Sequence, residues 1–487
     1  MTMGSFSSKS NSAEGKKPEG QADQLGEKVE KYMADVGSKA ADANPVSVEN
    51  LNNWEEELLS DRKNQLALSA LTKGDVKQII QRRSAVIKDS VHIFSDKVET
   101  EGTPVTDQKS SGRCWIFAAT NVMRTFVQKK YNLDDFQFSQ SYLFFYDKLE
   151  KANYFLQQII ETSDQDLDSR LIQTLLADPV SDGGQWDMIV NLVEKYGVCP
   201  HNVYPDAFNA TNSRTLNYVV VHKLREYALI LRKALADGRS SEDVNSLKEK
   251  LVKEIHGVLT ISLGNPPKPD EEIVWDYYDK NSKFNSVKTT PKNLYKDHVG
   301  YDVSEHFSLV HDPRHSYKEL YTVDRLGNVV GGKCIEYVNA EIDVLKQAAI
   351  KSIKNNEPVF FGSDVGKFSN KEGIMDTNAW DYELAFNTSL GLDKEQRLRT
   401  GESLMTHAMV LTAVNIVDGK PTKWRVENSW GDSTGHKGYW VMSDDWFNEY
   451  VYQVVTAPKY VDKEYVNVLK SKKFNTLPRW DPLGSLA

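Results

Sequence analysis

One cysteine of the 487-residue chain stands in a setting that favours nucleophilic chemistry. Cys114 follows a Gly-containing loop that starts at Gln108, and it begins an apolar helical pattern that extends to about Lys130. At a helix N-terminus, unpaired backbone N–H groups and the positive end of the helix dipole favour a thiolate. Thiol pKa values of roughly 3–4 are attainable in such settings. Cys114 is therefore the candidate nucleophile.

The glutamine before this cysteine is a candidate oxyanion donor. Gln108 can turn its side-chain amide toward the position of the thiol. Together with the Cys114 backbone N–H it would form a two-donor oxyanion hole, in which losing one donor costs about 3–4 kcal/mol. Cys199 and Cys334 lack this context, and both are interpreted as structural cysteines.

A histidine and an asparagine near the end of the chain could complete such a site. His407 begins a run of small and β-branched residues that predicts a buried strand, and Asn428 ends the next strand. A thiol nucleophile needs a base, and an amide oxygen can hold the far side of an imidazole ring in place. Trp430 could shield that contact from water. A histidine on a strand is by itself more often a core residue, and only the combined pattern favours catalysis.

These motifs resemble those of papain-like cysteine peptidases, and more narrowly those of the bleomycin hydrolase family. The resemblance spans about residues 48–487 and rests on DQKSSGRCWIFAA, SQSYLFFYDKLEKANYFL, DGGQW, ESLMTHAM, RVENSWG and the terminal WDPLGSLA. One common papain signature is absent, because the residues before the cysteine read Ser111-Gly-Arg instead of C-G-S/A. The long interval between Cys114 and His407 also exceeds that of a minimal enzyme. Neither departure removes a catalytic group.

The resemblance implies a role for each site residue. Cys114 would be the nucleophile, His407 the base and then the acid, Asn428 the orienting group and Gln108 the oxyanion donor. It also implies that the pair Gly183 and Gly184 forms the backbone edge that extended substrates approach, since glycine permits close contact. Taken alone, such a pair is more often a turn.

The apolar end of the chain bears on the type of peptidase. Leu477–Ala487 is largely apolar, which indicates a packed segment and not a solvated tail. By resemblance, this segment lies in the active-site cleft, where the Ala487 carboxylate receives the free α-amine of a substrate. The implied activity is that of a cysteine aminopeptidase without cofactor or metal. The carboxamide of bleomycin and homocysteine thiolactone are further implied substrates.

Partners and alternatives follow from the same comparison. The resemblance implies a homohexamer, to which the charged helical segments over residues 213–263 could contribute contacts. A nucleic-acid-binding assembly is an alternative, with His222–Lys233 and Lys470–Lys473 as the basic stretches. An ordinary papain-like endopeptidase and a catalytically inactive scaffold are the others, and the intact catalytic set argues against the scaffold.

Composition restricts the class of protein. The chain has 60 Lys and Arg against 69 Asp and Glu, a net charge of −9, which argues against nucleic-acid binding as the default. Its longest apolar runs are too short to span a bilayer. Three cysteines in so long a chain indicate a reducing compartment, and we expect the cytoplasm. A mitochondrial presequence is a weaker expectation, because no arginine precedes Arg62.

The expected elements define an α+β, papain-like two-lobe fold with a helical insertion and a C-terminal arm. Helices are predicted over 48–60, 72–84, 114–130, 139–160 and 186–197, and two more over 213–263. Strands are predicted over 273–279, 306–312, 318–325, 333–340, 358–364, 407–416, 423–430, 438–443 and 450–457.

The expected domains follow from these elements. Residues 1–45 are predicted to be disordered, because they offer almost nothing apolar to bury. The other predicted parts are a helical lobe with Cys114 (46–204), a helical insertion (205–300), a strand-rich lobe with His407 and Asn428 (301–465) and the arm (466–487).

Overall fold

Helices make up the smaller of the two units of the chain. The computed structural model describes residues 24–34 and 46–486, and it groups Tyr382–Leu390 with the residues up to Ile80. The elements of this unit are α1 (Gln24–Ala34), α2 (Val48–Ser60), α3 (Arg62–Leu71), α4 (Val76–Ile79) and α15 (Tyr382–Phe386).

The start of the chain contains one helix that the sequence analysis did not predict. Helix α1 lies within the segment expected to be disordered, and that expectation is wrong for residues 24–34. Val29 and Met33 are four residues apart, so they share one face of this helix. The remainder of the expected extension, residues 1–23 and 35–45, lies outside the described residues.

The next predicted helices have mixed outcomes. Helix α2 has the predicted bounds, and the Ser47 side chain caps it by accepting from the Asn50 N–H. The single helix predicted over residues 72–84 is wrong, because the chain turns at Gly74 and Asp75 caps the short α4. Gly at a helix end and Asp at the next N-cap explain the break.

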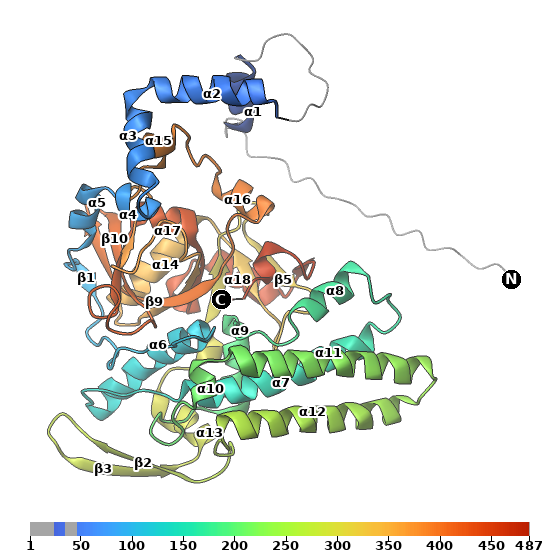
Figure 1. Ribbon diagram of the computed structural model, residues 1–487. Coiled ribbons are helices and arrows are strands. Elements are labelled where there is room, and N and C mark those ends of the chain that lie inside the picture. Colours follow the sequence, from blue (N-terminus) through green and yellow to red (C-terminus); the bar gives the residue numbers. More distant parts are fainter. Residues whose placement is uncertain (1–23, 35–45, 487) are drawn as a thin grey trace. The chain divides into compact units, whose positions relative to one another are not determined.

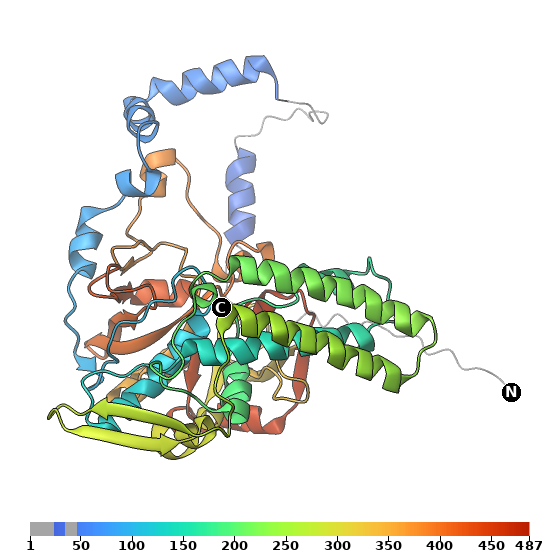
Figure 2. The same cartoon turned by 60° about the horizontal axis from the view of Figure 1, so that its bottom comes forward.

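The larger unit contains a helical side and a strand side. The helices of its first half are α5 (Arg83–Asp89), α6 (Cys114–Tyr131), α7 (Gln140–Glu161), α8 (Arg170–Ala177), α9 (Trp186–Tyr196), α10 (Phe208–Thr211), α11 (Arg214–Ala236) and α12 (Ser241–Leu263). Helices α7, α11 and α12 run side by side (Figure 1, Figure 2). Helices α6, α7 and α9 supply much of the core on this side, which explains their largely apolar sequences.

The strand side is a sheet of eleven strands. Ten strands have the order β13-β5-β6-β4-β12-β7-β9-β10-β11-β8, and β1 pairs with β9 at the side of this path. Their bounds are β1 (Asp96–Lys97), β4 (Phe307–Val310), β5 (Glu319–Val323), β6 (Tyr337–Asn339), β7 (Val359–Ser363), β8 (Ile374–Met375), β9 (His407–Val417), β10 (Lys420–Glu427), β11 (Tyr439–Ser443), β12 (Val451–Thr456) and β13 (Phe474–Leu477). The predicted strands of this region are confirmed, and so is the α+β class.

Several smaller elements complete the larger unit. Strands β2 (Ile273–Tyr278) and β3 (Phe284–Thr289) form a separate hairpin, visible at the lower edge of Figure 1. Helices α14 (Ile342–Lys354) and α17 (Asp444–Tyr450) contribute to the core of the sheet. The remaining helices are α13 (Pro291–Asn293), α16 (Lys394–Thr400) and α18 (Lys463–Ser471), with short η turns at Leu294–Val299, Val303–Glu305, Pro458–Tyr460 and Pro482–Gly484.

The sheet topology brings distant residues together at one position. Strand β9 lies between β7 and β10, and His407 at its start pairs with Ser363 at the end of β7. Strand β10 is antiparallel to β9, so the end of β10 lies near the start of β9, and Asn428 directly follows β10. Helix α6 packs against β9, so the edge of the sheet lies beside the start of that helix.

Candidate active site

The first residue of α6 is the candidate nucleophile. Cys114 is only 2% exposed, and its thiol receives backbone hydrogen bonding from Ala408, next to His407 in β9. Burial raises the pKa of the Cys114 thiol to about 11, although the surrounding backbone N–H groups oppose this shift. This direction is opposite to the one expected from the helix N-terminus alone, and a lowered thiol pKa stays a prediction. Desolvation disfavours a buried thiolate more than the helix terminus stabilises it.

The histidine and the asparagine are in direct contact. His407 Nε2 lies 2.9 Å from Asn428 Oδ1, and both side chains are buried. The Ser429 backbone N–H donates to the same Asn428 atom at 2.8 Å, so that atom must be the amide oxygen. The oxygen accepts, and Nε2 therefore carries the imidazole proton. In the neutral ring Nδ1 is then the atom able to take up a proton.

The imidazole lies in an environment that keeps it neutral. Burial lowers the pKa of His407 to about 4, and the hydrogen bond with Asn428 only partly opposes this. The Trp430 ring lies 4.8 Å from the imidazole ring, centroid to centroid, at an angle of 35°. This indole covers one face of the histidine. Ordinary solvation of an imidazolium is therefore prevented.

The glutamine lies between the nucleophile loop and the asparagine strand. Gln108 Oε1 accepts from the Ser429 hydroxyl at 2.7 Å, and Nε2 donates to the Ser111 carbonyl at 2.6 Å. The Gln108 backbone N–H also donates to the Ser429 carbonyl. An amide nitrogen has two hydrogens, so one remains for a substrate oxygen. The amide orientation is thus fixed by its neighbours.

A buried lysine of α7 holds the glycine pair. Lys151 Nζ donates to the carbonyls of Ser181 at 3.1 Å and Gly183 at 2.6 Å, and it pairs with Asp147 at 2.6 Å. Lys151 uses the Gly183 carbonyl, whereas both backbone groups of Gly184 have no hydrogen-bond partner among the described residues. A Cβ at Gly184 would lie 2.5 Å from the Trp115 ring, so only glycine fits.

The residue before the glycines links this loop to the nucleophile. Asp182 pairs with Lys148 at 2.6 Å, and it accepts from the Gly112 backbone N–H at 3.0 Å. Its own carbonyl accepts from the Trp115 indole at 2.7 Å. Burial opposes the charge, but Lys148 and the other donors hold the pKa of Asp182 well below its usual range. A charged carboxylate therefore joins the glycine loop to the loop before Cys114.

A buried ion pair joins the helix of the nucleophile to the strand of the asparagine. Arg124 on α6 pairs with Glu427 at 2.6 Å, with side-chain exposures of 0% and 2%. Arg124 also donates to the Pro104 carbonyl at 2.6 Å. Glu427 immediately precedes Asn428. The two catalytic elements are thus cross-linked by charge in the interior.

Comparison with known proteins now identifies the family. Residues 45–484 match the Peptidase C1-like family. Bleomycin hydrolase from Mus musculus is 46% identical over 444 residues, covering 89% of this chain and 96% of the relative. Cysteine proteinase 1, mitochondrial, from Saccharomyces cerevisiae is 43% identical over 451 residues, covering 91% and 93%.

This chain belongs to the Peptidase C1-like family. The crystal structure of PepW from Lactobacillus rhamnosis is 42% identical with a TM-score of 0.89, and the match covers 92% of this chain and all of PepW. The predicted papain-like fold is therefore confirmed. The chain is a papain-like cysteine aminopeptidase of the bleomycin hydrolase group. No described helix is long and apolar enough to cross a membrane.

The predicted C-terminal arm, residues 466–487, begins within α18 and includes β13 of the sheet, so the name arm is kept below for the part after β13, residues 478–486. This part lies beside the candidate catalytic groups. The Ser485 hydroxyl donates to the Met405 carbonyl at 3.0 Å, two residues before His407. The Ser485 carbonyl accepts from Gln185 Nε2 at 2.8 Å, directly after the glycine pair. Leu486 packs against the helical core, and the predicted receptor residue Ala487 lies outside the described residues.

The other two cysteines have different surroundings. Cys199 is buried in the core, and burial raises its pKa to about 12. Cys334 is exposed, and its interpretation as a structural residue stays a prediction.

Sequence reasoning missed the residues that hold the loops. Lys148, Lys151 and Asp182 were not singled out, although two lysines three residues apart in the apolar pattern of α7 were a visible signal. Arg113, which replaces a small residue of the papain signature, is fully buried and pairs with Asp206 at 3.0 Å. That ion pair explains how the family member accommodates the departure.

Proposed function

We propose that the chain removes N-terminal residues from peptides through an acyl-enzyme on Cys114. As Cys114 Sγ attacks the carbonyl carbon, its proton moves to His407 Nδ1, and the carbonyl oxygen receives hydrogen bonds from Gln108 Nε2 and the Cys114 N–H. The imidazolium then donates that proton to the leaving amine. A water molecule, deprotonated by His407, releases the acid and restores the thiol.

One observation carries this proposal, namely the hydrogen bond between His407 Nε2 and Asn428 Oδ1. It leaves Nδ1 as the basic atom on a ring that is next in sequence to Ala408, the residue that bonds the thiol. Burial keeps both Cys114 and His407 neutral before substrate binds. Proton transfer between neighbouring groups creates no net charge, so a buried pair can still react.

We also propose that the arm selects substrates with an unblocked N-terminus. The contacts of Ser485 place the end of the arm between Met405 and Gln185. A terminal carboxylate at Ala487 would pair with the α-ammonium of a peptide, and a charge-assisted contact of this kind rewards a charged amine over an acylated one. Gly184 would offer its unpartnered backbone N–H and carbonyl to the extended substrate.

The test compares a fluorogenic aminoacyl amide with its N-acetylated form. We expect a much larger kcat/KM for the unblocked amine, and loss of both activities after thiol alkylation. Equal rates would contradict the role of the arm and indicate an endopeptidase. Turnover that survives alkylation of Cys114 would contradict the nucleophile.

The finer substrates and the assembly are part of the same proposal. Relatives are named bleomycin hydrolase, and we propose that this chain hydrolyses the carboxamide of bleomycin and homocysteine thiolactone. We further propose a cytoplasmic homohexamer, although the yeast relative is named as mitochondrial. Product analysis by mass spectrometry and sedimentation equilibrium test these statements separately.

The nucleic-acid alternative gains little from the surface. Lys223 pairs with Glu226, Lys233 with Asp237, and Lys472 with Glu336, so acids accompany the basic stretches. Binding of single-stranded DNA that falls steeply with salt would revive this alternative.

A further inference from the structure

The arm is attached to the strand side at one charged contact, several residues before its end. Asp481 bonds the Arg314 guanidinium through both carboxylate oxygens, at 2.8 Å to Nη2 and 3.2 Å to Nη1. Arg314 lies in the loop after β4, and only 7% of its side chain is exposed. The corresponding value for Asp481 is 9%. Two-point contact of this kind fixes direction as well as distance.

Arg314 is itself held by a second carboxylate. Asp312 accepts from Arg314 Nε at 3.0 Å and from Nη2 at 2.7 Å, and its side chain is 1% exposed. Asp312 is in turn fixed because its backbone N–H donates to the Asn339 side chain at 2.9 Å. Burial opposes the charge of Arg314, but the two carboxylates raise the pKa of its guanidinium. The Arg314 guanidinium therefore has a fixed position on the strand side.

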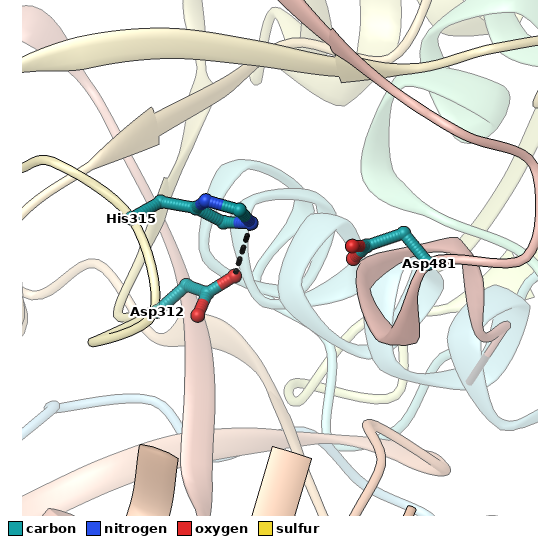
Figure 3. A group of neighbouring side chains, drawn as sticks. All are labelled: Asp312, His315 and Asp481. Carbon is teal, nitrogen blue, oxygen red and sulfur yellow. Dashed lines mark ion pairs between the residues drawn. The ribbon is translucent and has the colours of Figure 1, made fainter. Parts of the chain in front are cut away.

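The side chain of His315 lies beside the two carboxylates. Asp312, His315 and Asp481 converge in Figure 3, and their ligand atoms lie within 4.8 Å of one another. His315 Nε2 is 3.8 Å from Asp312 Oδ2. The permanently charged guanidinium of Arg314 already bonds both carboxylates, so it offsets part of their negative charge.

We propose that Arg314 and Asp481 are positioning residues that determine the selectivity for unblocked N-termini. This inference rests on the proposed role of the arm. The Asp481 carboxylate also caps the turn that follows it, because it accepts from the Leu483 N–H at 2.8 Å. The Leu483 side chain is buried. Ser485 then makes the two contacts described above. Because the ion pair between Arg314 and Asp481, here called the clamp, starts this short path, its geometry sets where Ser485 and Leu486 lie.

The decisive variant is Asp481→Asn. The asparagine oxygen can still accept from Leu483, and Arg314 keeps its two bonds with Asp312, so only the charged link to the arm is lost. We expect the ratio of kcat/KM for unblocked over N-acetylated amide to fall at least about tenfold, mainly through a higher KM for the unblocked substrate. Turnover of the acetylated amide should be unchanged or higher, which shows that the fold and the catalytic groups are intact.

Two further variants test the same prediction, one as a milder change and one as a control. Arg314→Lys keeps the charge but cannot bond two carboxylates in the plane of a fork, so we expect a smaller loss of selectivity in the same direction. Arg399→Gln is the matched control, since Arg399 lines the same cavity of about 700 Å³ as Arg314 and the arm but pairs with Glu395. Its selectivity should equal that of the natural chain.

Deletion of residues 485–487 distinguishes the proposed role of the arm from the proposed role of the clamp. If the deletion abolishes selectivity while Asp481→Asn retains it, the clamp is overturned and the role of the arm stands. If the deletion retains selectivity, the arm is not the amine receptor and both proposals fall. If both Asp481→Asn and Arg314→Lys lose turnover of the acetylated amide, the clamp serves folding, and its role in selectivity is overturned.

Discussion

The catalytic groups and the C-terminal arm lie side by side, yet they are held in different ways. Around Cys114, His407 and Asn428, the hydrogen bonds of the Asn428 oxygen with His407 and Ser429, and of Ser429 with Gln108, lie in the buried interior. The arm depends on the Asp481 clamp and the two hydrogen bonds of Ser485. If the arm has the proposed role, chemistry and selectivity have separate supports, and each can be altered without the other.

Removing the nucleophile is the strongest test of this separation. Cys114→Ala should reduce kcat by at least about 10⁴-fold, as expected when a covalent nucleophile is lost. The arm makes no contact through the thiol, so a substrate analogue with an unblocked amine should still bind better than its acetylated form. Equilibrium binding to the inactive variant measures this, and equal binding would show that selectivity depends on the thiol.

Removing the base should have the next largest effect. His407→Ala should lower kcat by about 10²–10⁴-fold, the usual contribution of a positioned base. Burial lowers the pKa of His407 to about 4, so the natural enzyme keeps a neutral base down to that pH. The acid limb of kcat against pH should have its midpoint near 4, well below the ordinary histidine value of 6.5. A midpoint near 6.5 would mean that water reaches the ring during turnover.

A change in the glycine loop should affect both regions moderately. Lys151→Met combined with Asp147→Asn removes the bond to the Gly183 carbonyl without leaving an unpaired buried charge. We expect KM to rise about tenfold for all peptides while kcat changes less, because Gly184 would lose its fixed position. Lys195→Met is a matched control on α9, since its ammonium pairs with Glu150 and not with the loop. Unchanged KM in the double variant would contradict the role of the loop.

The smallest effect on activity is expected from a carboxyl pair outside the site. Burial first, and then the nearby Asp376 charge, raise the pKa of Asp89 on α5 to about 7. An acid with a raised pKa in the folded state stabilises at low pH, and this contribution is lost as the pH rises through 7. Relative to Asp89→Asn, the natural chain should lose up to about 4 kcal/mol of unfolding free energy between about pH 4 and pH 8. Urea unfolding measures this, and a constant difference would contradict it.

Some of this could be predicted from the sequence, because the signals are local. Ser47 before an amphipathic run predicted α2, and alternating apolar residues predicted the strands that carry His407 and Asn428. The pairing of these two side chains follows from the antiparallel return of β10 onto β9.

Other features depend on contacts between distant segments. The pKa of Cys114 is set mainly by burial, which no helix N-terminus reveals. Lys148 and Lys151 bond a loop more than a helix away in sequence, so their burial could not be distinguished from a charged helix face. Arg314 and Asp481 are far apart in the chain, and nothing in either segment alone indicates the other.

The buried pair between Arg124 and Glu427 also has a consequence for how the molecule melts. Separation of α6 from β10 would strand two opposite charges in low-dielectric surroundings, and such a loss costs about 3–5 kcal/mol. Unfolding of one side of the larger unit while the other stays native therefore carries this additional free-energy cost. Heating should melt the helical and strand sides in one cooperative transition, and enzymatic activity should disappear in that same transition.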